Sequence, residues 1–231
     1  MTFRVRGMSH RLVGSILAFA LCGVGGATGL VAAPSQAAPA QQAPEKLPPG
    51  LHATPPGLGS YPYSDADVAF MTGMIPHHAQ ALIMAAWAPT HGARKDVGIL
   101  CERILVGQRD EIKLMQTWLR DRGLPVPDGT STRMKMMVNG QEHAMLMPGM
   151  LTDEEMAALD RARGPEFDRL FLTGMIKHHQ GAVDMVNKLF NSYGAAQDQT
   201  MYKFASDVYA DQSIEIARMK QMLKESPAPR Q

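Results

Sequence analysis

The stretch FMTGMIPHHAQALIM, from Phe70 to Met84, recurs later in the chain as FLTGMIKHHQGAVDM, from Phe171 to Met185. After one loop, each copy is followed by glutamine, glutamate and methionine at the same spacing: Gln108, Glu111 and Met115, then Gln212, Glu215 and Met219. An internal repeat decides the architecture, because each copy is one supersecondary unit that packs against the next. Imidazole, carboxylate and thioether groups therefore occupy matching levels of two similar units.

Helical periodicity predicts an all-α protein. Four long helices are expected at about 64–90, 94–122, 166–193 and 196–224, and a short helix is expected to begin at Thr152. Glycines at 92 and 194 break the first and third of these helices, and no stretch alternates as a strand does. The sequence thus predicts two antiparallel helix hairpins that form a four-helix bundle, joined by a long methionine-rich connection.

The predicted domain boundaries follow composition. Residues 1–38 resemble an export signal, with Arg4, Arg6 and Arg11 before an apolar stretch; an uncleaved membrane anchor is the alternative. Residues 39–64 read as an extended, unpacked Pro/Ala-rich linker. The bundle spans 65–224: repeat one 65–123, the connection 124–165 and repeat two 166–224. We expect an exported protein, periplasmic, at the cell surface or secreted, that meets a membrane only through an uncleaved leader.

Net charge and sulfur content limit the kinds of molecule that the protein is expected to bind. A net charge of +1 with no basic patch argues against nucleic acid, and no motif points to a protein partner. Without the leader, Cys101 is the one cysteine, so no intrachain disulfide can form. The chain has 18 methionines. Thioethers are soft ligands that select Cu(I) and do not form disulfides, although methionine is also an adaptable core residue.

The predicted inward-facing stripes carry the polar residues. His77 and His178 are expected to face the bundle interior, and His78 and His179 its rim. Counting back from each turn sets the histidines level with Gln108 and Gln212, and Met74 and Met175 level with Glu111 and Glu215. Methionines flank each inward histidine on its own helix: Met74 and Met84 in the first repeat, Met175 and Met185 in the second.

Burying so many polar side chains costs free energy unless each finds a partner, on the order of 1–3 kcal/mol per unsatisfied group. Two solutions remain open. The groups can satisfy one another, with Glu111 and Glu215 accepting hydrogen bonds from histidine. Alternatively, imidazole and thioether bind a metal while a carboxylate orients the imidazole. Repetition of the polar level in both halves, flanked by methionine each time, favours the metal.

These motifs resemble a known family. Met-Ile-Pro-His-His at 74–78, Met-Ile-Lys-His-His at 175–179, the Gln-x-x-Glu-Ile-x-x-Met segments at 108–115 and 212–219, and Met-Pro-Gly-Met at 147–150 are similar to the family catalogued as domain of unknown function 305. The resemblance implies a ferritin-like four-helix bundle, export and an association with copper. It implies the following metal ligands: His77, His78, His178, His179, Met74, Met84, Met175, Met185, Glu111, Met115, Glu215 and Met219.

Three functions compete. The first is extracytoplasmic copper buffering, storage or transfer, because a mixed imidazole and thioether set accepts Cu(I) or Cu(II). The second is a structural or interaction module whose buried His/Gln/Glu level fixes helix pairing. The third is a ferritin-like di-iron oxidase, which requires Glu-x-x-His motifs that the four predicted helices lack. We therefore expect a copper-binding protein and not an enzyme.

Overall fold

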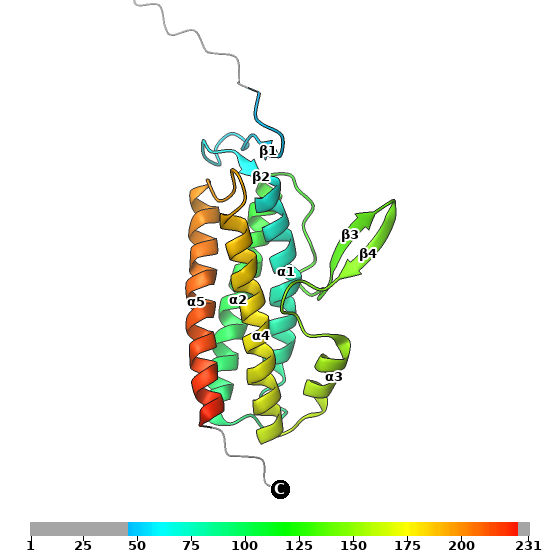
Figure 1. Ribbon diagram of the computed structural model, residues 1–231, viewed down its shortest axis with the longest axis vertical. Helices are drawn as coiled ribbons and strands as arrows, with labels where there is room; N and C mark the ends of the chain where they lie inside the picture. The colour runs from blue at the N-terminus through cyan, green and yellow to red at the C-terminus, as the bar shows by residue number, and fades with distance from the viewer. Residues whose placement is uncertain (1–45, 226–231) are drawn as a thin grey trace, which may run out of the picture. The chain divides into compact units, whose positions relative to one another are not determined.

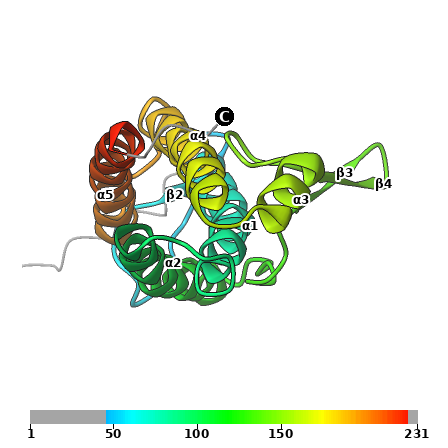
Figure 2. The ribbon, with the colours of Figure 1, turned by 90° about the horizontal axis from the view of Figure 1, so that it is seen from below.

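The computed structural model describes residues 46–225, apart from the side chains of residues 136–138. Four long helices dominate it: α1 (Asp65–Ala86), α2 (Lys95–Asp121), α4 (Pro165–Phe190) and α5 (Gln199–Lys224). α1 packs on α2, α4 on α5, and α1 on α4. Seen end-on, these four helices lie side by side, with the short α3 (Asp153–Arg161) outside them (Figure 2). The prediction of a mainly helical protein is confirmed, whereas the predicted leader 1–38 lies outside the described residues.

Local sequence explains where the helices begin. The Ser64 hydroxyl accepts a hydrogen bond from the Asp67 backbone, and the Asp67 carboxylate accepts one from the Ser64 backbone, so α1 opens with a capping box. Thr152 and Glu155 form the same arrangement at the start of α3, as the sequence predicts. Gly92 lies in the turn between α1 and α2 with φ of 70°, which glycine adopts without steric cost.

The connection contains a β-hairpin that the sequence analysis did not expect. Strands β3 (Met134–Val138) and β4 (Gln141–Met145) pair antiparallel around Asn139 and Gly140, and this hairpin projects beside α1 and α4 (Figure 1). Both turn residues have positive φ, 53° and 78°. Asn-Gly favours this turn because asparagine and glycine tolerate left-handed backbone conformations. The expectation of no strand was therefore wrong here, and the Asn-Gly pair is the local sequence signal for the hairpin.

The segment 46–64 is also more ordered than an extended linker. Its strands β1 (Leu51–His52) and β2 (Tyr63–Ser64) pair antiparallel directly before α1. Tyr63 is buried, and its ring contacts Trp118 of α2 edge-on at 5.7 Å between centroids. Leu51 packs against Gly194 in the turn before α5. Apolar side chains thus hold the second part of the expected linker against one end of the helices.

The core divides into two hydrophobic clusters. One contains Met74, Met115 and Met185, and the other contains Met84, Met175 and Met219. Eight buried or half-buried polar residues of the four long helices lie between them: His77, His78, Gln108, Glu111, His178, His179, Gln212 and Glu215. We call these eight residues the polar layer. Cys101 belongs to the second cluster, where burial raises the pKa of its thiol to about 12, so the metal-free protein keeps this thiol protonated at neutral pH.

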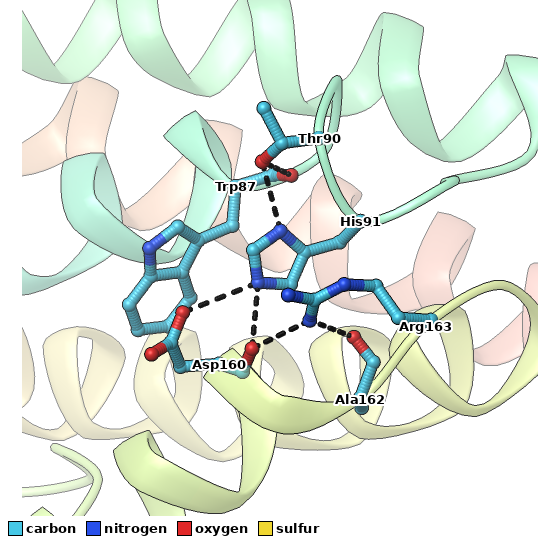
Figure 3. A network of polar contacts seen from close by, with 6 residues as sticks. All are labelled: Trp87, Thr90, His91, Asp160, Ala162 and Arg163. Atoms are coloured by element: carbon cyan, nitrogen blue, oxygen red, sulfur yellow. Dashed lines mark hydrogen bonds and ion pairs between the residues drawn. The ribbon is translucent and has the colours of Figure 1, made fainter.

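His91 has a structural role that we did not expect of a turn residue. It is buried in the turn after α1, where its Nε2 donates to the Asp160 carbonyl at 2.8 Å, and the Thr90 hydroxyl lies 2.9 Å from its Nδ1 (Figure 3). Arg163 donates to the same Asp160 carbonyl at 2.6 Å. His91 therefore fastens the end of α3 to the turn between α1 and α2.

Across residues 46–225, the helices lack the combination of length and hydropathy that a membrane span requires.

Candidate metal centre

The four histidines of the repeated motifs lie about halfway along α1 and α4, and all four are fully buried. His77 and His78 come from α1, and His178 and His179 from α4. The prediction that His78 and His179 lie at the rim is wrong. Their rings are enclosed because Glu111 of α2 packs against His78 and Glu215 of α5 packs against His179.

Two histidine–glutamate pairs define the outer parts of the layer. His78 Nε2 lies 2.6 Å from Glu111 Oε2, and His179 Nε2 lies 2.7 Å from Glu215 Oε2. The expected register, with histidine level with Gln108 or Gln212, is therefore displaced by about one helical turn. Residue counting aligns Cα atoms, whereas helical side chains lean toward the N-terminus of their own helix. On two antiparallel helices the side chains therefore lean toward each other along the bundle axis. Two side chains can then meet although their Cα atoms are not at the same level.

The inner pair, His77 and His178, meets at the centre of the layer. Their ring centroids are 3.8 Å apart with 39° between the planes. His178 Nε2 donates to the His77 carbonyl at 2.9 Å, and His77 Nε2 donates to the Pro148 carbonyl at 3.0 Å. The inward orientation expected for these two residues is therefore what the structure has.

The acceptors determine the tautomer of each ring. In every case Nε2 faces an oxygen that only accepts, a carboxylate or a backbone carbonyl, so Nε2 carries the proton. The Nδ1 atom of a neutral ring is then a bare lone pair. All four Nδ1 atoms are buried without a protein hydrogen-bond partner. A ring whose Nε2 is hydrogen-bonded to an oxygen while its Nδ1 has no partner has the orientation usual for a histidine ligand to a metal.

Burial keeps the inner rings neutral. It lowers the pKa of His77 to about 3, with the neighbouring His78 as the second cause. The pKa of His178 is also well below its usual value, because of burial first and His77 second. A neutral imidazole is the form that binds metals, so both inner rings keep a free lone pair far into the acidic range.

The same shifts predict a pH dependence of stability. Because the folded chain keeps His77 neutral while the unfolded chain takes up a proton below pH 6.5, stability is full above pH 6.5 and falls as the pH drops toward 3. Between pH 6.5 and 5 we expect a loss of about 2 kcal/mol from His77 and a further loss in the same direction from His178, measured by urea unfolding. The His77→Phe, His178→Phe variant should show a flatter profile, and equal slopes in both proteins would contradict the assignment.

Methionine surrounds the layer on both sides. Met74, Met84, Met115, Met175 and Met219 are fully inaccessible, and Met185 is 8% exposed. Within residues 46–225, no three His, Cys, Asp or Glu side chains form a group able to hold a metal. The histidines and glutamates thus do not complete a site by themselves. Imidazole and thioether donors lie next to each other here, and both are ligands that copper accepts.

A segment that the sequence analysis did not assign to the layer closes its α1–α4 side. Residues 147–151 cross these helices, and Pro148 supplies the carbonyl that holds His77. Gln80 fixes one end, donating to the Leu151 carbonyl and accepting from its amide at 2.9 and 2.8 Å. Gly181, which replaces Gln80 in the second motif, lets Pro148 and Gly149 lie directly on α4. The sequence does contain a sign of this contact: the two motifs are otherwise similar, but the first has Gln80 where the second has Gly181.

On the opposite side, a cavity of about 240 Å³ opens between α2 and α5. Glu111, Glu215 and Asp211 line it, together with Gln108 and Gln212, whose Oε1 atoms are buried without a partner. Burial, and then the charges of the two glutamates, raise the pKa of Asp211. Arg103 also lines the groove, so three carboxylates outnumber one guanidinium there. The excess negative charge attracts cations toward the layer.

The fold and the site together define a helical protein with a buried layer of imidazole and carboxylate between methionine-rich clusters. A family description, Domain of unknown function (DUF305), matches residues 67–223. The chain belongs to this family.

Solved structures are similar to the chain as well. A DUF305 fragment from Deinococcus radiodurans is 26% identical over 71% of this chain and 98% of its own, with a TM-score of 0.57. A DUF305 protein of Streptomyces coelicolor, named as a secreted protein, is 27% identical over 70% and 93%, with a TM-score of 0.58. CopM in its Cu(I)-bound form is 31% identical over 69% and 96%, with a TM-score of 0.53. No curated protein matches the chain.

Proposed function

We propose that this protein binds copper outside the cytoplasm and buffers, stores or transfers it. The observation that carries the proposal is the set of four buried Nδ1 atoms without protein partners, placed between methionine-rich clusters. Leaving a buried polar atom unsatisfied costs roughly 1–3 kcal/mol, and a bound ion would offset this cost for each Nδ1 atom that it contacts. CopM, with structures in Cu(I)-bound and Cu(II)-bound forms, supports copper as the ion.

The ligands would come from both hairpins. On α1 and α2, Met74 and His78 lie one helical turn apart, as do Glu111 and Met115. On α4 and α5, Met175 and His179 pair with Glu215 and Met219 in the same way. Thioether and Nδ1 would bind the metal while each glutamate orients its imidazole. The proposed architecture is a ferritin-like four-helix bundle made of two repeated hairpins, and copper would enter through the acidic groove between α2 and α5.

A structural module is the second candidate, because the two His–Glu pairs and the stacked inner rings could fix helix pairing without a metal. This candidate leaves all four Nδ1 atoms without a partner, whereas bound copper would give partners to those of His78 and His179. Catalysis is a weaker proposal, because α1, α2, α4 and α5 contain no Glu-x-x-His motif of the di-iron type. The export signal expected in residues 1–38 supports an extracytoplasmic location.

Metal titration tests the proposal. We expect Cu(I) and Cu(II) to raise the melting temperature of the purified chain, by an amount equivalent to about 2.7 kcal/mol when free copper is 100 times the Kd. Zinc and iron should shift it less, since thioether ligands favour copper. Calorimetry gives the stoichiometry in the same experiment. Equal shifts with iron, or no shift with any metal, would overturn the proposal, and the second outcome would favour the structural module.

A further inference from the structure

A separate cavity lies outside the polar layer, between the methionine-rich connection and the outer surface of α1 and α4. Its volume is about 410 Å³. Four thioethers reach it, from Met134, Met145, Met147 and Met185, with Phe70 on one wall and Lys188 also among its lining residues. We call it the thioether pocket. Three of its four methionines come from the connection, which the proposed function does not use as a ligand source.

The first two methionines form a pair at the base of the β-hairpin. Met134 of β3 is the direct antiparallel partner of Met145 of β4. Opposite residues on one face of such a pair have Cβ atoms about 4.5–5.5 Å apart, so both thioethers can reach a common atom. Met145 is 44% exposed, which makes its sulfur accessible from solvent. Met134 is half-buried, and neither methionine belongs to the two core clusters.

The other two methionines meet over a glycine of α1. The methyl carbons of Met147 and Met185 lie 2.7 and 3.5 Å from the position that a Cβ on Gly73 would occupy. Gly174 has the same place in the second motif, and there the contacts are Leu151 and Met84. Leucine therefore fills this kind of position in the other half, and methionine and leucine are nearly equivalent in volume. Packing alone does not require sulfur at Met147.

We propose that the thioether pocket is a second metal site, selective for a soft monovalent cation such as Cu(I). Four neutral sulfur donors suit such an ion and offer little to Zn²⁺ or Ca²⁺. Methionine has three rotatable bonds, so the four sulfurs can close on an ion smaller than the cavity. The site does not depend on the polar layer being occupied. The two are nonetheless adjacent, since Pro148 follows Met147 and holds His77 through its carbonyl.

Silver titration tests the pocket, with Ag(I) as a soft monovalent probe that does not change oxidation state under these conditions. The background variant His78→Ala, His179→Ala removes the two glutamate-oriented rings of the layer. On this background we expect one equivalent of Ag(I) to remain bound and to shift the methyl NMR signals of the four pocket methionines. Adding Met134→Leu, Met145→Leu and Met147→Leu should abolish this equivalent, because leucine preserves volume and removes sulfur.

Met201→Leu is the matched control, since Met201 is fully buried but does not line the pocket. It should leave the Ag(I) equivalent unchanged. The pocket assignment is wrong if the triple leucine variant binds as much silver as its background, or if silver shifts only methionine signals from elsewhere. A pocket that takes an apolar molecule equally well before and after the leucine replacements would also overturn it. Failure of the copper proposal alone would leave the pocket equivalent intact.

Discussion

The double replacement His78→Ala, His179→Ala should remove the copper-dependent stabilisation that the polar layer provides. In the parent protein this stabilisation is about 2.7 kcal/mol at free copper 100 times the Kd. The variant loses two Nδ1 donors together with the rings that Glu111 and Glu215 orient. The measurement is the melting temperature with and without copper, combined with calorimetric stoichiometry.

His91→Ala provides the control for loss of a buried imidazole. His91 is 4% exposed, and its ring nitrogens already contact Thr90 and Asp160. Its replacement should lower stability without copper, because α3 loses its attachment, yet the copper-induced increase should persist. If His91→Ala abolishes that increase as thoroughly as the double replacement does, the effect reflects general loss of folding and not loss of ligands.

Gly181→Ala should cause the largest loss of stability from a single small substitution. A Cβ on Gly181 would overlap the Pro148 carbonyl, and it would lie 2.7 Å from Gly149 Cα. The contact is between backbones, so no flexible side chain can move aside. We expect a loss of about 3 kcal/mol in the free energy of unfolding by urea, at the upper end of typical overpacking costs. The displaced Pro148 carbonyl should also release His77.

Gly107→Ala separates steric overlap from the general effect of glycine in a helix. Gly107 lies inside α2, and an added Cβ would meet no atom within 4 Å. Here alanine should stabilise the protein by about 0.5–1 kcal/mol, because it reduces the backbone freedom of the unfolded chain. We therefore expect the free energy of unfolding to fall for Gly181→Ala and to rise for Gly107→Ala. A small effect at Gly181 would mean that residues 147–151 do not press on α4.

Local patterns determined much of this protein in advance. The spacing of apolar residues predicts the long helices, and the capping box at Thr152 predicts the start of α3, because both depend on residues a few positions apart. The repeated His-His motif likewise indicated a buried polar level. The Asn-Gly turn at Asn139 is also a local signal for the hairpin, although helical periodicity gives no indication of strands there.

Other features depended on contacts between distant segments. The pairing of His78 with Glu111 in place of Gln108 follows from the direction in which side chains lean on antiparallel helices, which residue counting omits. His91 donates a hydrogen bond to the Asp160 carbonyl, and His77 donates one to the Pro148 carbonyl. In both cases the two partners are far apart in the sequence. The chain itself thus determined which chemical groups are present and on which helices. Only tertiary packing decided which nitrogen of each ring is bonded and which is left bare, because that depends on the acceptors that the neighbouring segments supply.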